Sequence, residues 1–397
     1  GLSQKAGATE REELVAGGCG HGCGHNMLGA GAMAAAFGIK KYLEKKGEGH
    51  GTVIFFGCPG EEGGASKAFM ARDGVWKDLD AALTWHPSDV NQVTSGTCNS
   101  CIQTEYIFKG VASHASGAPE FGRSAVDAVE VMNMGVQFLR EHMPDSARIH
   151  YAITDAGGNS PNVVQPHARV LYMVRSKLAK DALALQARVD KIAQAAAMMT
   201  ETEVRQQFID GCSNTVPNRV LEQLLWDNFD QVGVDTYTPE EMEYAKKIMD
   251  SYEMKSDRLP GAACDEDEAI AAFVDEKSQH GTRPMNDFLI PYHYSDRQRA
   301  GSTDVGDVSW LTPTAQINAA SFVSKAPGHS WQNVSCGHTS IGHKSVITAG
   351  KVLAATAMDL YEKPEILKAA REEFEKKTAG GYYCPVPADA VPVVPGQ

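Results

Sequence analysis

The first hundred residues alternate between long amphipathic stretches and short apolar runs. Residues 26–46 place apolar side chains at helical spacing and end in lysine and glutamate, which predicts a helix. Residues 52–56 and 81–85 are apolar runs of strand type, and residues 65–72 between them have helical spacing. Strand, helix and strand in this order predict a buried parallel sheet with crossover helices.

Six segments in the middle of the chain follow the order βαββαβ, which is that of a ferredoxin-like unit. They are strand 102–108, helix 125–142, strands 148–154 and 168–175, helix 180–199 and strand 203–208. Such a unit leaves the edges of its sheet open, so we expect an edge-to-edge dimer contact here.

Helical patterns resume at residues 221–229 and 239–251, and a long polar segment then extends to Gly301. The last well-formed helix is expected at residues 346–361, before a tail rich in proline and valine. The simplest architecture is one discontinuous α/β domain into which the middle unit is inserted. The expected boundaries are 1–98 and 213–397 for the discontinuous domain and 99–212 for the inserted unit.

The composition excludes several classes of partner. The chain has 397 residues, of which 43% are hydrophobic, and this is enough for two packed cores. Its net charge of -13 argues against nucleic acid or an anionic membrane as the main partner. No stretch reaches the roughly 20 apolar residues of a membrane span, and no signal peptide is visible. Nine cysteines without a regular framework suit a reducing compartment, so we expect a cytoplasmic protein.

A thiol and an imidazole stand two residues apart near the start of the chain, at Cys23 and His25. Both are good ligands for a transition ion, although a single buried cysteine or histidine is more often structural. Cys19 and His21 repeat the same tripeptide four residues earlier. Spacing alone does not choose between the two pairs.

Two adjacent carboxylates, Glu61 and Glu62, follow the apolar run at residues 52–56 in a loop flanked by glycines. One carboxylate of such a pair can bind metal while the other holds a water molecule as general base. His86 follows the next apolar run directly, and His329 stands in a glycine-containing loop near the end of the chain. We regard these histidines as the third and fourth candidate positions for metal ligation.

Seven short motifs occur in order along the chain. They are GHGCGHN at 20–26, PGEEG at 59–63, WHP at 85–87, SHA at 113–115, NVV at 162–164, STDVGDVS at 302–309 and GHS at 328–330. This order resembles the aminoacylase/carboxypeptidase family of co-catalytic metallopeptidases, and most of all its branch that acts on p-aminobenzoyl-glutamate. The resemblance covers essentially the whole chain, including YCPVP at 383–387.

The resemblance implies a three-layer catalytic domain with a mixed, mainly parallel sheet, interrupted by a ferredoxin-like α+β dimerisation domain. It also implies two divalent ions per chain, Mn²⁺ or Zn²⁺, with Glu61 as the general base. The expected ligands are Cys23, His25, Glu62, His86 and His329. The ending His-Asn at 25–26 selects the second tripeptide over Cys19 and His21.

The resemblance assigns three further residues to the substrate. His114 reaches across a dimer to polarise the scissile carbonyl and to stabilise the oxyanion. Asn162 and Arg175 hold the carboxylate of the substrate, a role that suits the forked guanidinium. A lone histidine or a strand arginine is also a common structural residue, and the sequence alone leaves both interpretations open.

The resulting hypothesis is a metal-dependent amidohydrolase for N-acyl amino acids, above all p-aminobenzoyl-glutamate. It acts as a homodimer or as a heteromer with a related subunit. Two alternatives remain: a dipeptidase or general N-acyl-amino-acid hydrolase, and a non-catalytic partner subunit with the same fold.

Family members also place a strand–helix–strand region with a supporting Asp before the glycine-rich opening. None precedes Gly20 here, so we expect a smaller sheet and metal affinity lower by about 10–100-fold.

Overall fold

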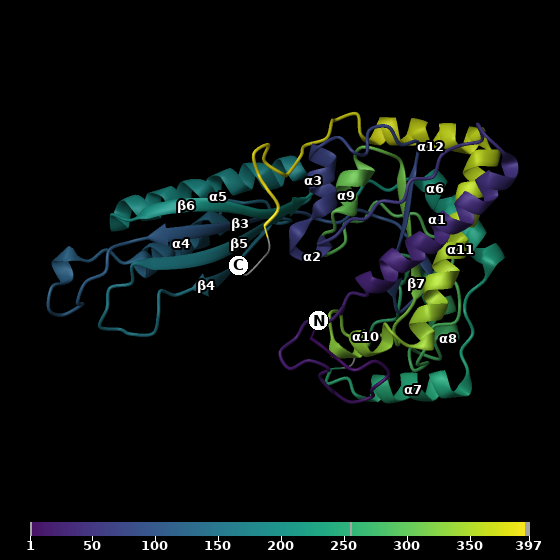
Figure 1. Cartoon of the computed structure of the whole chain (residues 1–397), viewed down its shortest axis with the longest axis horizontal. Coiled ribbons are helices and arrows are strands. Elements are labelled where there is room, and N and C mark those ends of the chain that lie inside the picture. The colour runs from purple at the N-terminus through teal and green to yellow at the C-terminus, as the bar shows by residue number, and fades with distance from the viewer. Residues whose placement is uncertain (1, 255, 394–397) are drawn as a thin grey trace.

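The computed structural model describes residues 2–254 and 256–393. Figure 1 shows a body, which contains the first and the last helices of the chain, and an elongated arm that projects from it. A three-stranded sheet lies in the body and a four-stranded sheet lies in the arm. The architecture is therefore mixed α/β, as the sequence predicts.

The body sheet has the order β1-β7-β2, formed by β1 (Ala82–Ser88), β7 (Thr314–Ala320) and β2 (Gln92–Thr94). β1 runs parallel to β7, whereas β2 runs antiparallel to it, so the sheet is mixed. Two long helices, α1 (His25–Lys46) and α11 (Ser340–Glu362), pack along each other and against β1. The helix predicted at residues 26–46 is confirmed.

A close contact fixes α1 on β1. Trp85 of β1 is fully buried, and its Nε1 donates a hydrogen bond to the carbonyl oxygen of Leu28 at 2.9 Å. A Cβ atom at Gly31 would lie 2.5 Å from the same nitrogen, so only glycine allows the helix to approach this closely. The contact holds the amino end of α1, which carries His25, near the strand that carries His86.

The arm contains the βαββαβ unit that the sequence predicts, with the sheet order β4-β5-β3-β6 and every neighbouring pair antiparallel. Its elements are β3 (Ser100–Lys109), α4 (Ala125–Arg140), β4 (Arg148–Asp155), β5 (His167–Ser176), α5 (Ala179–Thr200) and β6 (Glu203–Cys212). The arm joins the body at the start of β3 and at the end of β6.

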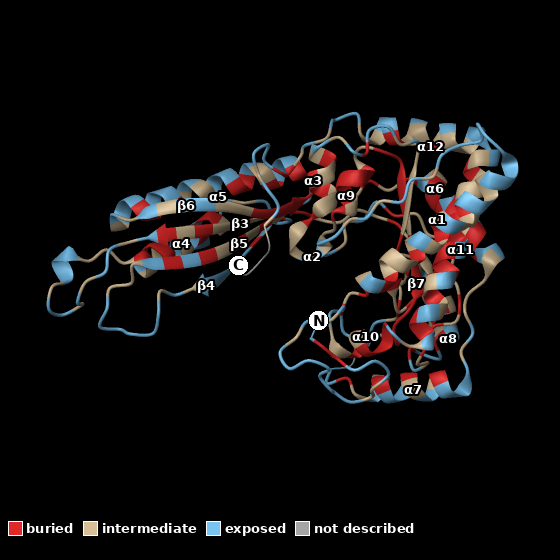
Figure 2. Cartoon of the chain, viewed as in Figure 1, coloured by how far each residue is buried: buried red, intermediate tan, exposed pale blue. Residues whose placement is uncertain are grey.

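The core of the arm lies between its sheet and its two helices. Tyr106 and Tyr172 on neighbouring strands, Met132 of α4 and Val189 of α5 are all fully inaccessible to solvent. Figure 2 shows buried residues on the parts of these helices that face the sheet and exposed residues on their outer surfaces. Alternating burial along β3 and β5 explains why the sequence pattern identified these strands.

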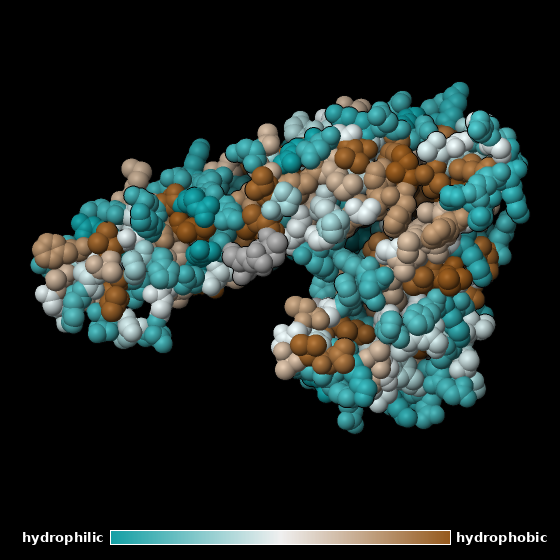
Figure 3. Space-filling view, viewed as in Figure 1, coloured by the Kyte–Doolittle hydropathy of each residue, from teal (hydrophilic) through white to brown (hydrophobic). Residues whose placement is uncertain are grey.

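Residues 52–56 differ from the prediction, because they form no strand. A strand needs a neighbour that shares its backbone hydrogen bonds, and in the described part of the chain no strand pairs with this segment. Ile54 and Phe55 are exposed there, as are Met33 and Phe37 on α1. Figure 3 shows hydrophobic side chains at the surface of the body, where helices α1 and α11 lie.

The carboxyl-terminal region also differs from the prediction. The helix expected to be the last, at residues 346–361, is followed by another, α12 (Pro364–Lys377). Pro364 occupies the first turn of α12, where its missing N–H group costs nothing, so this proline begins a helix rather than a tail.

The remaining elements fill the body and connect its parts. They are α2 (Glu61–Gly64), α3 (Ser66–Arg72), α6 (Arg219–Val232), α7 (Pro239–Asp250), α8 (Glu268–Lys277), α9 (Val305–Ser309), α10 (Trp331–Cys336) and two short 3₁₀ turns, Pro119–Phe121 and Ala262–Asp265. Among the residues that the structure describes, no helix is long and apolar enough to cross a membrane.

Candidate active site

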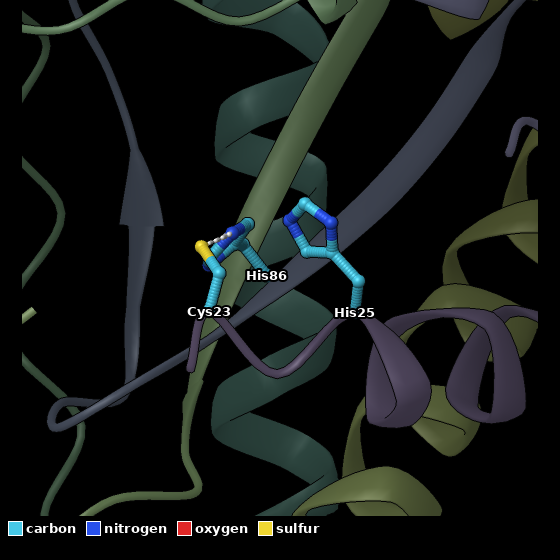
Figure 4. Close-up of side chains that lie close together, drawn as sticks. All are labelled: Cys23, His25 and His86. Atoms are coloured by element: carbon cyan, nitrogen blue, oxygen red, sulfur yellow. Dashed lines mark hydrogen bonds between the residues drawn. The ribbon is translucent and has the colours of Figure 1, made fainter. Parts of the chain in front are cut away.

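Six side chains singled out in the sequence lie together in the body. Their ligand atoms form three overlapping groups, and within each group the atoms lie within 4.8 Å of one another. The groups are Cys23, His25 and His86; Cys23, Glu62 and His329; and His25, Glu61 and Glu62. Figure 4 shows the first group, in which one thiol and two imidazoles converge from the amino end of α1 and from β1.

Gly24 allows Cys23 and His25 to serve the same cluster. Its φ angle of 81° lies in the left-handed region, which favours glycine. A Cβ atom at this position would also come within 3.0 Å of Phe322 and Pro87. The chain therefore turns sharply between the two candidate ligands, and any larger residue would push the turn away from the cluster.

The other side of the cluster also has unusual backbone geometry. Gly60, which precedes the two carboxylates, has a φ angle of 71°. His329 has a φ angle of 57°, although it is not glycine, and such a conformation costs about 1–3 kcal/mol unless the surroundings impose it. Five other non-glycine residues of the described chain share such a φ angle, so the contact between Nε2 of His329 and Glu62, and not the φ angle alone, supports a role for His329 beyond packing.

His86 is oriented for ligation by its own strand end. Its Nδ1 lies 2.7 Å from the carbonyl oxygen of Pro87, so Nδ1 carries the proton and donates it. The lone pair of Nε2 is then free, and this atom lies 3.4 Å from the sulfur of Cys23. A backbone carbonyl that orients an imidazole in this way is a common feature of metal-binding histidines.

The cluster contains acidic groups, but its partly buried imidazoles contribute no positive charge at neutral pH. Burial, together with the nearby charge of Glu62, raises the pKa of the Cys23 thiol to about 12. Burial also lowers the pKa of both His25 and His86, so neither imidazole supplies positive charge at neutral pH. Two carboxylates, a thiol and neutral imidazoles are a suitable donor set for a transition ion, which would supply the missing charge.

The two carboxylates have different surroundings. Burial raises the pKa of Glu61 to about 7, and the charge of Asp304 acts in the same direction. The Oε2 atom of Glu61 lies 3.7 Å from Nε2 of His25. Glu62 is more exposed, with 52% of its side chain accessible, and its Oε1 lies 3.2 Å from Nε2 of His329. A carboxyl group with a pKa near neutrality is suited to accept and return a proton.

A buried ion pair beside Glu61 was not identified from the sequence. The Nζ atom of Lys67 lies 2.7 Å from Oδ1 of Asp304, and the backbone N–H of Lys67 donates to Oδ2 at 2.9 Å. Asp304 belongs to one of the seven motifs, so the sequence could have marked this aspartate as a candidate functional residue. Its partner on α3 is 237 residues away and could not be recognised from sequence.

The earlier tripeptide lies outside the cluster. Cys19 and His21 belong to none of the three groups of potential ligands in the described residues. Cys19 is exposed and forms an isolated bridge with Leu2. The geometry therefore favours Cys23 and His25, the pair that the motif ending in His-Asn selects.

His114 and Asn162 lie together at the end of the arm away from the body. Both are exposed, and their two segments are joined by a hydrogen bond from the N–H of Ala115 to the carbonyl oxygen of Asn162 at 3.0 Å. The N–H of Gly117 donates to Nδ1 of His114 at 3.0 Å. The neutral ring consequently carries its proton on Nε2, which remains available to donate to a carbonyl oxygen.

Arg175 lies at the opposite end of β5 from Asn162. The ten residues of β5 span roughly 30 Å at about 3.3 Å per residue, so the two side chains do not meet within one chain. Arg175 instead reaches the body, where its Nη1 donates to the Ser302 hydroxyl at 2.8 Å. Within one chain, the sequence-based pairing of Asn162 with Arg175 around one carboxylate is therefore not formed.

Comparisons with known proteins show similarity along most of the chain. The family model of Peptidase family M20/M25/M40 matches residues 6–292. One of the subunits of p-aminobenzoyl-glutamate hydrolase from Escherichia coli (strain K12) is 43% identical over 395 residues, which cover 99% of this chain and 81% of that protein. The Xaa-Arg dipeptidase of Mus musculus is 25% identical over 367 residues, which cover 90% of this chain and 70% of that protein.

A solved structure, that of the aminobenzoyl-glutamate utilization protein from Klebsiella pneumoniae, aligns with a TM-score of 0.45 and 16% sequence identity. The alignment covers 74% of this chain and 58% of that chain. Separately, the match of the family model to residues 6–292 agrees with the family that the seven sequence motifs resemble.

Proposed function

Because the chain belongs to Peptidase family M20/M25/M40, we propose that it is a metal-dependent amidohydrolase that cleaves p-aminobenzoyl-glutamate into p-aminobenzoate and glutamate. The observation that carries the proposal is the convergence of six metal- and base-type side chains in one cluster. The substrate is inferred from the name of the Escherichia coli relative, which is 43% identical to this chain.

The ligands in this proposal are Cys23, His25, Glu62, His86 and His329. They would hold two divalent ions, Mn²⁺ or Zn²⁺, and bound ions of this kind polarise an amide carbonyl and activate a water molecule. His86 contributes Nε2, because its Nδ1 is committed to the Pro87 carbonyl. Cys23 contributes its thiolate, so binding releases a proton from its sulfur.

Glu61 is the general base of the proposed reaction. It accepts a proton from the attacking water at Oε1 or Oε2 and returns that proton to the nitrogen of the leaving amine. The buried Lys67–Asp304 pair limits the movement of the segment that carries this carboxylate, because the backbone N–H of Lys67 is held by Asp304. Amide hydrolysis needs no further covalent partner from the chain.

We also propose that the site is completed by a second subunit. His114 and Asn162 are exposed at the far end of the arm, so each is free to enter the site of a partner. β4 is an edge strand, and its side chains Tyr151 and Ile153 are exposed. Pairing of this edge with a second copy, or with a related subunit, would cover them and deliver His114 to the scissile carbonyl.

Arg175 is the proposed anchor for the substrate carboxylate. It lies where the arm meets the body, and its bond to Ser302 leaves other guanidinium N–H groups to donate. In an assembled dimer, Arg175 of one chain and Asn162 of the other would hold the carboxylate together.

The protein is further proposed to be cytoplasmic, because its nine free cysteines suit a reducing compartment.

Release of p-aminobenzoate by the purified, metal-loaded chain tests this function. Glu61→Gln should keep its metal and lose turnover by about 10²–10⁴-fold, whereas the matched variant Glu62→Gln should lose metal as well. Equal metal content in the two variants would contradict the division of roles.

Similarity to an Xaa-Arg dipeptidase favours a second candidate, a dipeptidase built on the same cluster. Turnover of dipeptides but not of p-aminobenzoyl-glutamate would support it. Turnover that appears only with an added related subunit, and that persists when this chain carries Glu61→Gln, would instead indicate a non-catalytic partner.

A further inference from the structure

Two cysteines face each other at the junction between the arm and the body. β3 begins at Ser100 and β6 ends at Cys212, and these two points are the connections between the parts. Cys101 is paired with Cys212 in the antiparallel register of β3 and β6. Their sulfur atoms lie 3.4 Å apart, and both residues are buried, with 7% and 4% of their surface exposed.

The backbone already has the spacing that a disulfide needs. Directly opposed residues on antiparallel strands have Cα atoms about 4.5–5.5 Å apart, which lies within the range of about 4.4–6.8 Å seen across disulfides. The sulfur atoms of Cys101 and Cys212 would need to approach only from 3.4 Å to about 2.05 Å. Side-chain rotation suffices, and no change of strand register is required.

The surroundings distinguish the two thiols. The hydrogen bond with Cys212 lowers the pKa of Cys101 despite its burial, and the positive charge of Arg175 acts in the same direction. Arg175 is the residue opposite Cys101 on β5, the strand on its other side. The same interaction raises the pKa of Cys212, and burial acts in the same direction. Thiolate character next to an arginine is typical of a cysteine that reacts first.

We propose that Cys101 and Cys212 form a reversible dithiol–disulfide site that is oxidised by hydrogen peroxide. Because both residues are buried, a small oxidant reaches them more readily than a disulfide-containing peptide does. In a reducing compartment, disulfides of proteins are usually transient and serve redox sensing, which suits a pair that requires no rearrangement.

The chemistry takes two steps. The thiolate of Cys101 attacks one oxygen of the peroxide, which gives a sulfenic acid and hydroxide; the hydroxide takes up the proton that the thiol released and becomes water. The sulfur of Cys212 then attacks the sulfur of Cys101, forming the S–S bond and releasing a second water. Two electrons pass from the two thiols to one peroxide molecule, and a dithiol reductant reverses the reaction.

The disulfide would tie together the two connections of the arm. It would close a loop between residues that are 111 positions apart in the sequence, and so would restrict the unfolded chain. It would also restrain β3 and β6 beside Arg175, the residue through which the arm reaches Ser302. A change in turnover on oxidation is a further consequence, and this part rests on the proposed function.

Peptide mapping without reduction provides the first test. The reduced full-length chain is treated with hydrogen peroxide, its remaining thiols are alkylated, and the digest is searched for a peptide that links Cys101 to Cys212. The oxidised protein should show this link and a melting temperature several degrees higher, and dithiothreitol should reverse both. Absence of the link under conditions that oxidise other cysteines would overturn the proposal. Neither measurement needs substrate, so failure of the proposed function would leave this result unaffected.

Matched variants separate the pair from its neighbours. Cys101→Ala and Cys212→Ala should each lose the reversible rise in melting temperature, whereas Cys98→Ala, three residues from Cys101, should keep it. Reduced variants are first compared with the wild type by circular dichroism, and one folded member of the pair is enough for the test. A rise that persists in either folded variant would refute the assignment. After treatment with hydrogen peroxide, the turnover of the wild type should fall reversibly, whereas that of Cys101→Ala should not. Equal losses of turnover in the two proteins would overturn the proposed effect on activity.

Discussion

Lys67 and Asp304 form a buried ion pair in which one carboxylate accepts both the ammonium group and the backbone N–H of the same residue, at 2.7 and 2.9 Å. The Asp304 side chain is 1% exposed and that of Lys67 is 16% exposed. The pair joins α3 to the segment that leads into α9, directly beside Glu61. The segment that carries the base is therefore restrained by a contact between residues 237 positions apart in the sequence.

Removal of one partner of this pair should be costly. Lys67→Met leaves the Asp304 charge buried without a partner, and we expect the free energy of unfolding to fall by about 3–5 kcal/mol. The double variant Lys67→Met/Asp304→Asn should recover much of that loss, because it removes the second charge. Urea unfolding measures both changes. Lys368→Met breaks an exposed ion pair and should cost less than about 1 kcal/mol, and a similar loss in this control would contradict the prediction.

Metal content should depend on Cys23 and not on Cys19. Cys23→Ala removes a thiol that is shared by two of the three potential ligand groups, so elemental analysis should show that bound Mn²⁺ or Zn²⁺ is lost. Cys19→Ala changes an exposed thiol outside the cluster and should keep the wild-type stoichiometry. The reverse result would place the metal on the earlier tripeptide.

Mixed assemblies should regain activity if the arm serves a partner's site. His114→Ala and Glu61→Gln should each be inactive alone, since each removes a different part of every site. After subunit exchange, a mixed dimer contains one site with both intact residues, so up to half of the sites in that dimer should turn over substrate. Subunit exchange is verified with labelled chains. No recovery after exchange would place His114 in its own chain's site or outside catalysis.

Arg175 should determine the need for a carboxylate on the substrate. Charge-assisted hydrogen bonds are worth about 1.5–3 kcal/mol, so Arg175→Ala should lower kcat/KM for p-aminobenzoyl-glutamate by roughly 10–200-fold. The wild type should also discriminate against the α-amide of that substrate, and the variant should not. Equal wild-type efficiency on the acid and on the amide would remove the carboxylate requirement. Comparison with the alanine analogue tests the preference for glutamate.

Glu222 should make the stability of the body depend on pH. Burial raises the pKa of this 1% exposed carboxyl group to about 7, although Ser95 and Tyr292 donate hydrogen bonds to it. Below the ordinary value of 4.5, the group is protonated in the folded and the unfolded chain and has no effect. Between 4.5 and about 7 the unfolded chain loses the proton first, so stability falls as pH rises, by about 3 kcal/mol in total.

The variant Glu222→Gln isolates this effect, because its side chain has a similar size and does not titrate. The difference in unfolding free energy between the wild type and the variant should change across pH 4.5–7 and be constant above that range. Glu372→Gln, on an exposed part of α12, should run parallel to the wild type at every pH. If the unfolding free energy of Glu222→Gln also ran parallel to that of the wild type across this pH range, Glu222 would have an ordinary pKa and the prediction would be wrong.

The sequence by itself predicted those features that local patterns encode. Alternating burial along β3 and β5 and helical spacing in α1 reflect which face of each element meets the core, and such periodicity is visible in a single segment. The motif at residues 20–26 also led, through its resemblance to a family, to the expectation that Cys23 and His25 share a site, and the structure brings the two side chains together.

Only the tertiary structure decided which distant segments meet. Residues 52–56 have the composition of a strand, yet strand formation depends on a hydrogen-bonding neighbour and not on composition. The pairing of Cys101 with Cys212 depends on strand order and register, which hydrophobic pattern alone does not encode. The separation of Asn162 from Arg175 follows from the length of β5, because a strand holds its two ends apart.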